Sequence, residues 1–155
     1  MAATDRLNRV LRRRAPSDVI LARGHVNITA TNRRTLEITK DPYVTRRGDC
    51  IIACCADKAG PELAGDLLEA LIRPGTVRIV VEAGGMGYAI TGRTPLAMPT
   101  SPYRLVVRRS NHVDDSTLAV GADGAAADLP RDLVSRLRDG VVVRVEVEVR
   151  PDGLT

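Results

Sequence analysis

The chain has 155 residues, 44% of them hydrophobic, which suits one compact domain or two closely joined halves. No apolar run approaches the roughly 20 residues of a membrane-spanning helix, and no apolar segment follows the N-terminal arginines as a secretion signal would require, so we expect a soluble, cytoplasmic protein without a membrane partner. The net charge is +4, and a basic tail over residues 1–17, with five arginines and one aspartate, accounts for it. This tail is predicted to be either a short amphipathic helix that ends at Pro16 or a solvated arm.

The next part of the chain predicts strands, one short helix and a hairpin. Alternating apolar residues predict strands over 18–30 (with a bend at Gly24), 35–40 and 50–56, and helical apolar spacing predicts a helix over 61–72. The strand over 50–56 is apolar on both faces, so we expect it at the centre of a sheet. A strand over 77–82 then leads through Gly84-Gly85 into a hairpin partner over 88–91.

The chain also contains an internal repeat. A shift of 66 positions aligns 49–82 with 115–148 without a gap, and a shift of 69 aligns 34–40 with 103–109. The second copy therefore predicts strands over 103–109, 117–121 and 141–149 and a helix over 129–137. We predict an α+β, β-dominated fold: an internally duplicated, mostly antiparallel β sandwich or barrel-like domain with two short helices. Residues 18–155 would form this single domain, with halves at about 18–91 and 92–150.

Four motifs give a resemblance to a known family. They are Gly24-His25-x-Asn27, Thr35-Leu36-Glu37-x-Thr39-Lys40, Arg47-Gly48-Asp49-Cys50-Ile51-Ile52 and Ala56-Asp57-Lys58-Ala59. In these residues the chain resembles an archaeal family of uncharacterised proteins, domain of unknown function 371 (DUF371). The resemblance implies an archaeal, cytoplasmic protein with a β-rich, sandwich-like domain, and it implies no activity. The chain departs from the pattern at Gly124, where similar members tend to repeat the lysine that follows Asp57. Gly48-Asp49 is also similar to a turn of double-psi barrels, an alternative topology.

Polar residues of the first half form one candidate site. Asp57 and Lys58 lie at a predicted strand-to-helix junction, where free backbone N–H groups favour anions, and Lys58 would add a positive charge. Asn27, Lys40 and Asp49 are further candidates for binding a ligand.

The same set allows acid–base chemistry. His25 would act as acid or base, together with Asp57 or Asp49. The plainer alternative is that both aspartates shape loops, because they recur as Asp123 and Asp115, and that His25 is a hydrogen-bonded structural residue.

Arginine pairs form a second candidate site. Arg33-Arg34, Arg46-Arg47 and Arg108-Arg109 lie on or beside predicted loops, and Arg12–Arg14 belong to the basic tail. Gathered on one face they would bind phosphates; scattered, they would only be solvated. The cysteines lack metal-site spacing, so we predict no metal and no cofactor, and we expect Cys50 to be buried and inert.

These patterns leave two hypotheses for function. The first is a binding protein for an anionic ligand, either RNA or a phosphate-bearing, nucleotide-like small molecule. The alternative is a small enzyme that uses His25 with Asp57 or Asp49 and holds its substrate with Lys58. Convergence of these groups in one pocket would favour the enzyme, whereas scattering of them, with the arginines on one face, would favour the binding protein.

Overall fold

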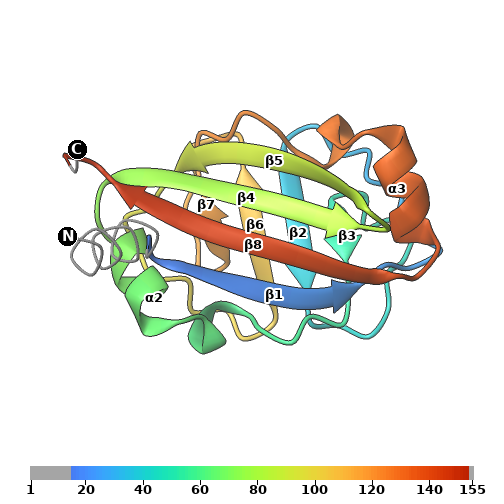
Figure 1. Ribbon diagram of the computed structural model, residues 1–155, viewed down its shortest axis with the longest axis horizontal. Coiled ribbons are helices and arrows are strands. Elements are labelled where there is room, and N and C mark those ends of the chain that lie inside the picture. Colours follow the sequence, from blue (N-terminus) through green and yellow to red (C-terminus); the bar gives the residue numbers. More distant parts are fainter. Residues whose placement is uncertain (1–14, 154–155) are drawn as a thin grey trace, which may run out of the picture.

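The computed structural model describes residues 15–153, which form two four-stranded sheets that face each other as a sandwich (Figure 1). In chain order the elements are β1 (Ser17–Arg23), β2 (Thr35–Thr39), β3 (Ile51–Ala53), the 3-10 helix η1 (Gly60–Glu62), α2 (Gly65–Leu71), β4 (Gly75–Ala83), β5 (Met86–Arg93), β6 (Arg104–Arg108), β7 (Thr117–Ala119), the 3-10 helix η2 (Ala126–Asp128), α3 (Arg131–Arg138) and β8 (Val142–Pro151). The helix predicted for the basic tail lies outside the described residues. None of the described helices has the length and apolar character needed to cross a membrane.

The strand orders show the duplication. One sheet has the order β1-β8-β4-β5 and the other β3-β2-β6-β7. Exchanging β1 with β5, β2 with β6, β3 with β7 and β4 with β8 reverses each order and leaves it otherwise unchanged, so a pseudo-two-fold axis passes through the middle of both sheets. Four of the six strand pairs are antiparallel. The predicted duplicated, β-dominated, mostly antiparallel sandwich with two short helices is confirmed.

The pairing registers show that the axis passes between one pair of equivalent residues in each sheet. In one sheet Glu37 of β2 lies opposite Val106 of β6, its equivalent at the shift of 69. In the other sheet Val80 of β4 lies opposite Glu146 of β8, its equivalent at the shift of 66. The parallel pairs β2–β3 and β6–β7 also share one register irregularity at equivalent positions. The two halves therefore match residue by residue, including their departures from regular pairing.

The core between the sheets is aliphatic, because the chain has no Phe and no Trp. Alternate residues of β4 and β8 point inward and are fully buried, namely Val77, Ile79, Val81, Val143, Val145, Val147 and Val149. Each such side chain contributes roughly 1.5–3 kcal/mol when fully buried. The helices lie at opposite ends of the molecule (Figure 1) and close the core there with buried leucines such as Leu67 and Leu133.

Two strand predictions need correction. The strand expected at the centre of a sheet, over 50–56, is β3, which lies at a sheet edge and pairs only with β2. It is nevertheless buried because the chain beyond it crosses to the other sheet, where Cys54 bridges Arg23 at the end of β1. The strand predicted over 18–30 stops at Arg23. The backbone at Gly24 packs so closely against α3 that an added Cβ would lie 1.8 Å from the carbonyl oxygen of Leu137.

Candidate functional site

Asp57 joins the loop after β3 to the edge of β1. Its Oδ1 accepts a hydrogen bond from the Leu21 amide at 2.9 Å, and its own amide donates to the Leu21 carbonyl at 2.9 Å. Asp123 makes the same two contacts with Thr91 of β5, each at 2.9 Å. The paired contacts satisfy backbone groups at both edges of one sheet, so this carboxylate is engaged in the scaffold in both halves.

Asp49 likewise makes contacts that recur. Its carbonyl oxygen accepts the amides of Thr31 and Asn32, at 3.0 and 3.1 Å, and the carbonyl of Asp115 accepts the amides of Thr100 and Ser101, both at 2.8 Å. In the first half Asp49 Oδ1 also accepts a hydrogen bond from the side-chain Nδ2 of Asn32 at 3.2 Å. The backbone carbonyl at this position therefore holds the loop before β2, as that of Asp115 holds the loop before β6.

Lys40 forms an ion pair that the repeat reproduces. Its Nζ binds Glu62 of η1, and the equivalent Arg109 binds Asp128 of η2 with an Nη2–Oδ2 distance of 2.6 Å. In each case the hydrogen bond from the cation lowers the pKa of the carboxyl group. Both contacts attach a 3-10 helix to the residue that follows a strand of the β3-β2-β6-β7 sheet.

Lys58 is different, because its ion pair occurs in the first half alone. Its Nζ donates to Asp18 Oδ1 at 2.7 Å and to the Val19 carbonyl at 3.0 Å. Burial by itself would raise the pKa of Asp18, but hydrogen bonds from Lys58 and from the amides of Ala64 and Val19 outweigh it, and the pKa is lowered. In the second half Gly124 replaces Lys58, and an added Cβ there would lie 3.0 Å from Ile90.

His25 and Asn27 lie in the turn that follows β1. The Nδ1 of His25 accepts a hydrogen bond from the Asn27 amide at 3.0 Å, and the Asn27 side chain donates to the Val44 carbonyl at 3.0 Å. Lys58 reaches Asp18 near the start of β1, Asp57 contacts Leu21 in its middle, and His25 lies beyond its end. At about 3.3 Å of strand per residue, these groups are spread along β1 and do not converge.

The structure brings the candidate arginines together more closely. Arg33 and Arg34, and Arg46 and Arg47, lie on two loops, residues 31–34 and 45–48, that we call the arginine loops. The Asp49 carbonyl directly after the second loop binds two amides of the first, so the loops are neighbours. All four side chains are exposed, and none forms an ion pair with a described residue. The third predicted pair differs, because Arg108 and Arg109 form ion pairs with Asp114 and Asp128.

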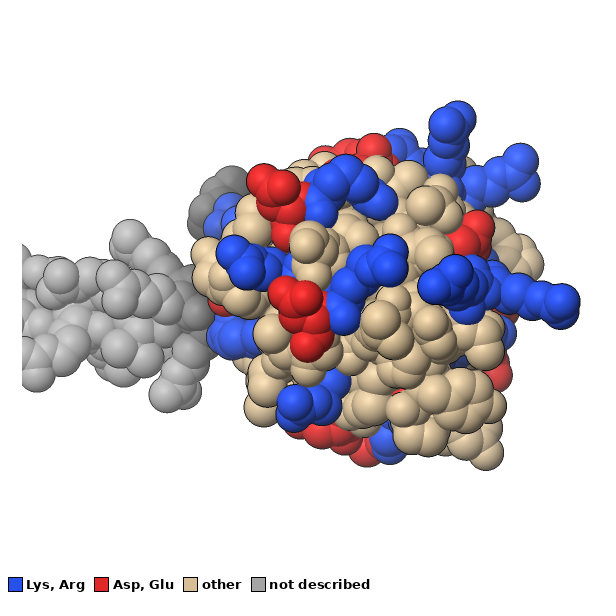
Figure 2. Space-filling view, turned by 90° about the vertical axis from the view of Figure 1, so that its right-hand side faces the viewer, with Lys and Arg blue, Asp and Glu red and all other residues tan. Residues whose placement is uncertain are grey.

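The first arginine loop lies near the end of the molecule that carries α3 (Figure 1). The Asn32 carbonyl accepts the Ala127 amide of η2 at 2.8 Å, and Arg131 at the start of α3 donates to the Ala30 carbonyl at 2.9 Å. Figure 2 looks onto this end and shows basic side chains projecting from its upper and right-hand edge, while elsewhere on the face basic and acidic side chains lie side by side.

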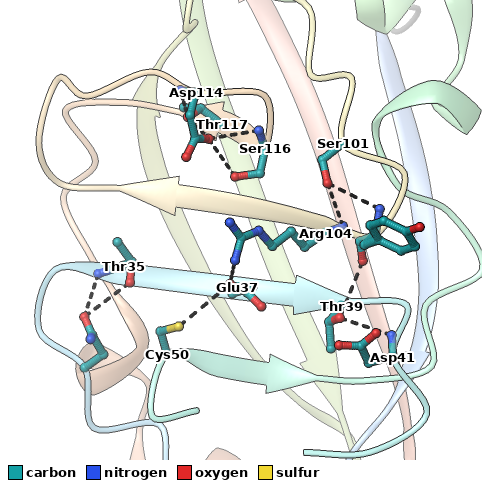
Figure 3. Close-up of polar contacts among 12 residues, drawn as sticks. Thr35, Glu37, Thr39, Asp41, Cys50, Ser101, Arg104, Asp114, Ser116 and Thr117 are labelled. Carbon is teal, nitrogen blue, oxygen red and sulfur yellow. Dashed lines mark hydrogen bonds and ion pairs between the residues drawn. The ribbon is translucent and has the colours of Figure 1, made fainter. Parts of the chain in front are cut away.

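Sequence reasoning missed one polar cluster, on the face of β2 turned away from the core (Figure 3). Glu37 lies there between Arg104, with an Nη1–Oε1 distance of 3.7 Å, and the thiol of Cys50, with an Sγ–Oε1 distance of 4.0 Å. Burial raises the pKa of Glu37, an effect that Arg104 opposes, and burial next to Glu37 raises the pKa of Cys50. Cys50, expected to be buried, is half-buried, and the raised pKa of its thiol favours the protonated form. Glu37 alternates with buried Leu36 and Ile38, a pattern that predicts exposure, so the sequence carried no signal of its burial.

No described pocket collects the predicted catalytic residues. One groove lies beside α2 and is lined by Asp66, Glu69 and Arg73 among others, and a second lies at the Gly84-Gly85 turn. None of the candidate residues lines either groove. Among residues 15–153, no group of three His, Cys, Asp or Glu side chains is placed to hold a metal ion.

Comparison with known proteins confirms the resemblance seen in the motifs. The model of the family described as "Domain of unknown function (DUF371)" matches residues 20–150. The chain is also 34% identical over 123 residues to the uncharacterized protein MJ0206 of Methanocaldococcus jannaschii, an alignment that covers 79% of this chain and 91% of that protein.

Proposed function

The chain belongs to the family of domain of unknown function 371 (DUF371), and we propose that it binds an anionic ligand, either RNA or a nucleotide-like molecule, through the arginine loops. The observation that carries the proposal is the uneven pairing of arginines between the two halves. Among the described residues, every arginine in an ion pair belongs to the second half: Arg93, Arg104, Arg108, Arg109, Arg144 and Arg150. The positive charge left without an acidic partner includes all four residues of the arginine loops.

Unpaired guanidinium groups suit phosphate. Arginine presents several N–H donors in a planar fork, so it binds phosphate oxygens through two parallel hydrogen bonds. An arginine already held by a carboxylate would have to give up that partner first, which lowers the net gain. Arg33, Arg34, Arg46 and Arg47 have no such partner among the described residues.

The loop geometry supports the same assignment. The amides of Thr31 and Asn32 bind the carbonyl oxygen of Asp49, which fixes the first arginine loop against the end of the second. Loops that are fixed before binding lose less conformational entropy when a ligand binds. The equivalents of Arg33 and Arg34 at the shift of 69 are Pro102 and Tyr103, so the proposed site is single although the fold is duplicated.

The proposal is tested by fluorescence anisotropy with labelled single-stranded RNA, with unlabelled nucleoside triphosphate as competitor. We expect Arg46→Ala plus Arg47→Ala to weaken RNA binding at least tenfold and to reduce the slope of log K against log salt by roughly 0.7 for each lost phosphate contact. The competitor separates the two ligand classes. A nucleotide-like ligand would displace the RNA at comparable concentration, whereas an RNA site would need a large excess of nucleotide.

The matched control is Arg73→Ala plus Arg78→Ala. These two arginines are also exposed and without an ion pair among the described residues, and their loss changes the net charge equally, but they lie beside α2 and on β4. If both double variants weakened RNA binding equally, the effect would come from the overall charge of the protein and not from the arginine loops. Unchanged binding in Arg46→Ala plus Arg47→Ala across the salt series would remove the arginine loops as the site.

A further inference from the structure

Two neighbouring cysteines after β3 lie in direct contact. The Sγ atoms of Cys54 and Cys55 are 2.7 Å apart, well inside ordinary non-bonded contact, and a disulfide bond would bring them to about 2.0 Å. Cys54 is buried, with 1% of its surface exposed, whereas Cys55 is exposed. The pair therefore has one sulfur within reach of solutes and one that is shielded.

The contact departs from what a regular strand would give. Successive side chains of a strand point to opposite faces, which predicts Cys54 and Cys55 on opposite sides. In the structure Cys55 has a φ of 61°, in the left-handed region, and this turn of the backbone brings its side chain back to that of Cys54.

The second half shows that the backbone turn does not need cysteine. The residue equivalent to Cys55 is Gly121, with a φ of 56°, and the residue equivalent to Cys54 is Val120. Glycine adopts a left-handed φ freely, while another residue loses roughly 1–2 kcal/mol there. The first half therefore holds a cysteine in a strained backbone conformation where the scaffold accepts glycine, and such outliers cluster at functional positions.

We propose that Cys54 and Cys55 form a reversible disulfide with each other, a redox modification site that exchanges with small thiols and disulfides. The geometry supplies both partners without movement of a distant segment. The bond closes a small ring through the peptide group that joins the two residues, and disulfides in constrained geometries are reduced more readily than relaxed structural ones.

The chemistry proceeds in two exchange steps. The thiolate of exposed Cys55 attacks a sulfur of a small disulfide, forms a mixed disulfide and releases one thiol. Cys54 then loses its proton and attacks Cys55 Sγ, which closes the ring and releases the second thiol. Overall, two protein thiols are oxidised to one disulfide, and one small disulfide is reduced to two thiols.

The order of the steps follows from the burial of Cys54. Burial, together with the neighbouring Cys55 thiol, raises the pKa of Cys54 to about 12, so Cys54 is protonated at neutral pH and cannot begin the exchange. Its sulfur also lies 3.9 Å from the carbonyl oxygen of Gly24, which can accept a hydrogen bond from the S–H group. The proton that Cys54 loses in the second step passes through solvent to the small thiolate that is released. Exposed Cys55 is therefore the entry point and Cys54 the residue that displaces the bound thiol.

The test is intact-mass spectrometry of the full chain after treatment with oxidised glutathione and then with dithiothreitol. We expect the wild-type protein to lose two hydrogen atoms on oxidation and to regain them on reduction. Peptide mapping should place the bond between residues 54 and 55. Cys50→Ser should behave as the wild type does, because Cys50 takes no part in the exchange.

The second half supplies the variants that separate the two roles. Cys54→Val copies Val120 and should stop at a stable glutathione adduct on Cys55, whereas Cys55→Gly copies Gly121 and should form neither the ring nor an adduct at Cys54. Circular dichroism spectra like that of the wild type would show that both variants fold. A wild-type protein that stops at the adduct, or a bond that involves Cys50 or a second chain, would overturn the proposal.

Discussion

The two halves of the molecule share a scaffold and differ in the charged and reactive residues placed on it. The side-chain contacts of Asp57 and Lys40 recur in the second half with Asp123 and Arg109, and the backbone carbonyl groups of Asp49 and Asp115 make equivalent contacts. Since both halves need the same bends and strand edges, a polar residue with the same contacts in both is explained by the fold. Residues found in one half only have no such explanation from the repeat.

Several features are confined to the first half. They include the arginine loops, the Lys58–Asp18 ion pair, the Cys54–Cys55 pair and the half-buried Glu37. The first three lie on or next to loops at the ends of β1, β2 and β3, while the repeated contacts hold those loops in place. The repeated residues therefore position the loops, whereas most of the residues found in the first half alone are exposed or reactive groups that those loops carry.

The largest expected effect comes from a position where the halves differ in size. Gly60 of η1 packs so tightly that an added Cβ would lie 2.1 Å from the carbonyl oxygen of Pro99, whereas the equivalent residue of η2 is a buried alanine, Ala126. We expect Gly60→Ala to lower the free energy of unfolding by about 3 kcal/mol or more, because the contact is with rigid backbone. Urea denaturation at pH 7 measures the change.

Gly65→Ala is the matched control for this substitution. An added Cβ at Gly65 meets no atom within 4 Å, and alanine is favoured over glycine in a helix by up to about 1 kcal/mol. We therefore expect this variant to be as stable as the wild type or slightly more stable. Equal behaviour of the two alanine variants would show that η1 shifts freely and would weaken the claim that the halves are packed differently here.

A smaller effect is expected from the ion pair that only the first half has. Lys58→Met removes the cation from Asp18, whose side chain is 14% exposed, and should lower the free energy of unfolding by about 2 kcal/mol at pH 7. The pKa of Asp18 is lowered in the folded protein, so its contribution is present above the unfolded value near 3.8 and is lost as the pH falls through the folded value.

The pH dependence gives the sharper measurement for this pair. The difference in unfolding free energy between wild type and Lys58→Met should be largest near pH 7 and should shrink as the pH falls below 4. In an Asp18→Asn background, most of the pH dependence of the difference caused by Lys58→Met should disappear. A difference that stays constant from pH 7 to pH 3 would mean that Lys58 stabilises the fold by packing of its alkyl chain and not through Asp18.

The sequence predicted the duplicated fold well because the repeat and the change of apolar spacing are both visible in it. It did not show that β5 takes the place of β1, because the aligned stretches begin at residues 34 and 49. The strand order and the repeated bridges of Arg23 and Arg93 reveal this relation. The prediction that the strand over 50–56 lies at the centre of a sheet was wrong. A strand at a sheet edge is also buried on both faces when the chain continues from it into the opposite sheet.

The candidate site was less predictable, because its properties depend on pairing in space. The sequence grouped Lys40 and Lys58 with the arginines as candidate ligand-binding residues. It could not show that the two lysines form ion pairs with Glu62 and Asp18. Strand alternation predicts Cys54 and Cys55 on opposite faces, because the left-handed backbone conformation of Cys55 cannot be read from residue spacing. The recurrence of Asp57 as Asp123 did carry a usable signal, namely that one contact serves both halves.

The smallest expected effect, and the most direct test of the comparison, is a matched pair of substitutions. Asp57→Ala and Asp123→Ala each remove a carboxylate that accepts a strand-edge amide, and each should lower the free energy of unfolding by about 1 kcal/mol. The two losses should agree within roughly 0.5 kcal/mol in urea denaturation and should add in the double variant, because the sites lie at opposite edges of one sheet. Asp57→Asn keeps an accepting oxygen and should recover most of the stability. If Asp57→Ala instead weakened RNA binding without a loss of stability while Asp123→Ala did the reverse, Asp57 would belong to the site and not to the scaffold.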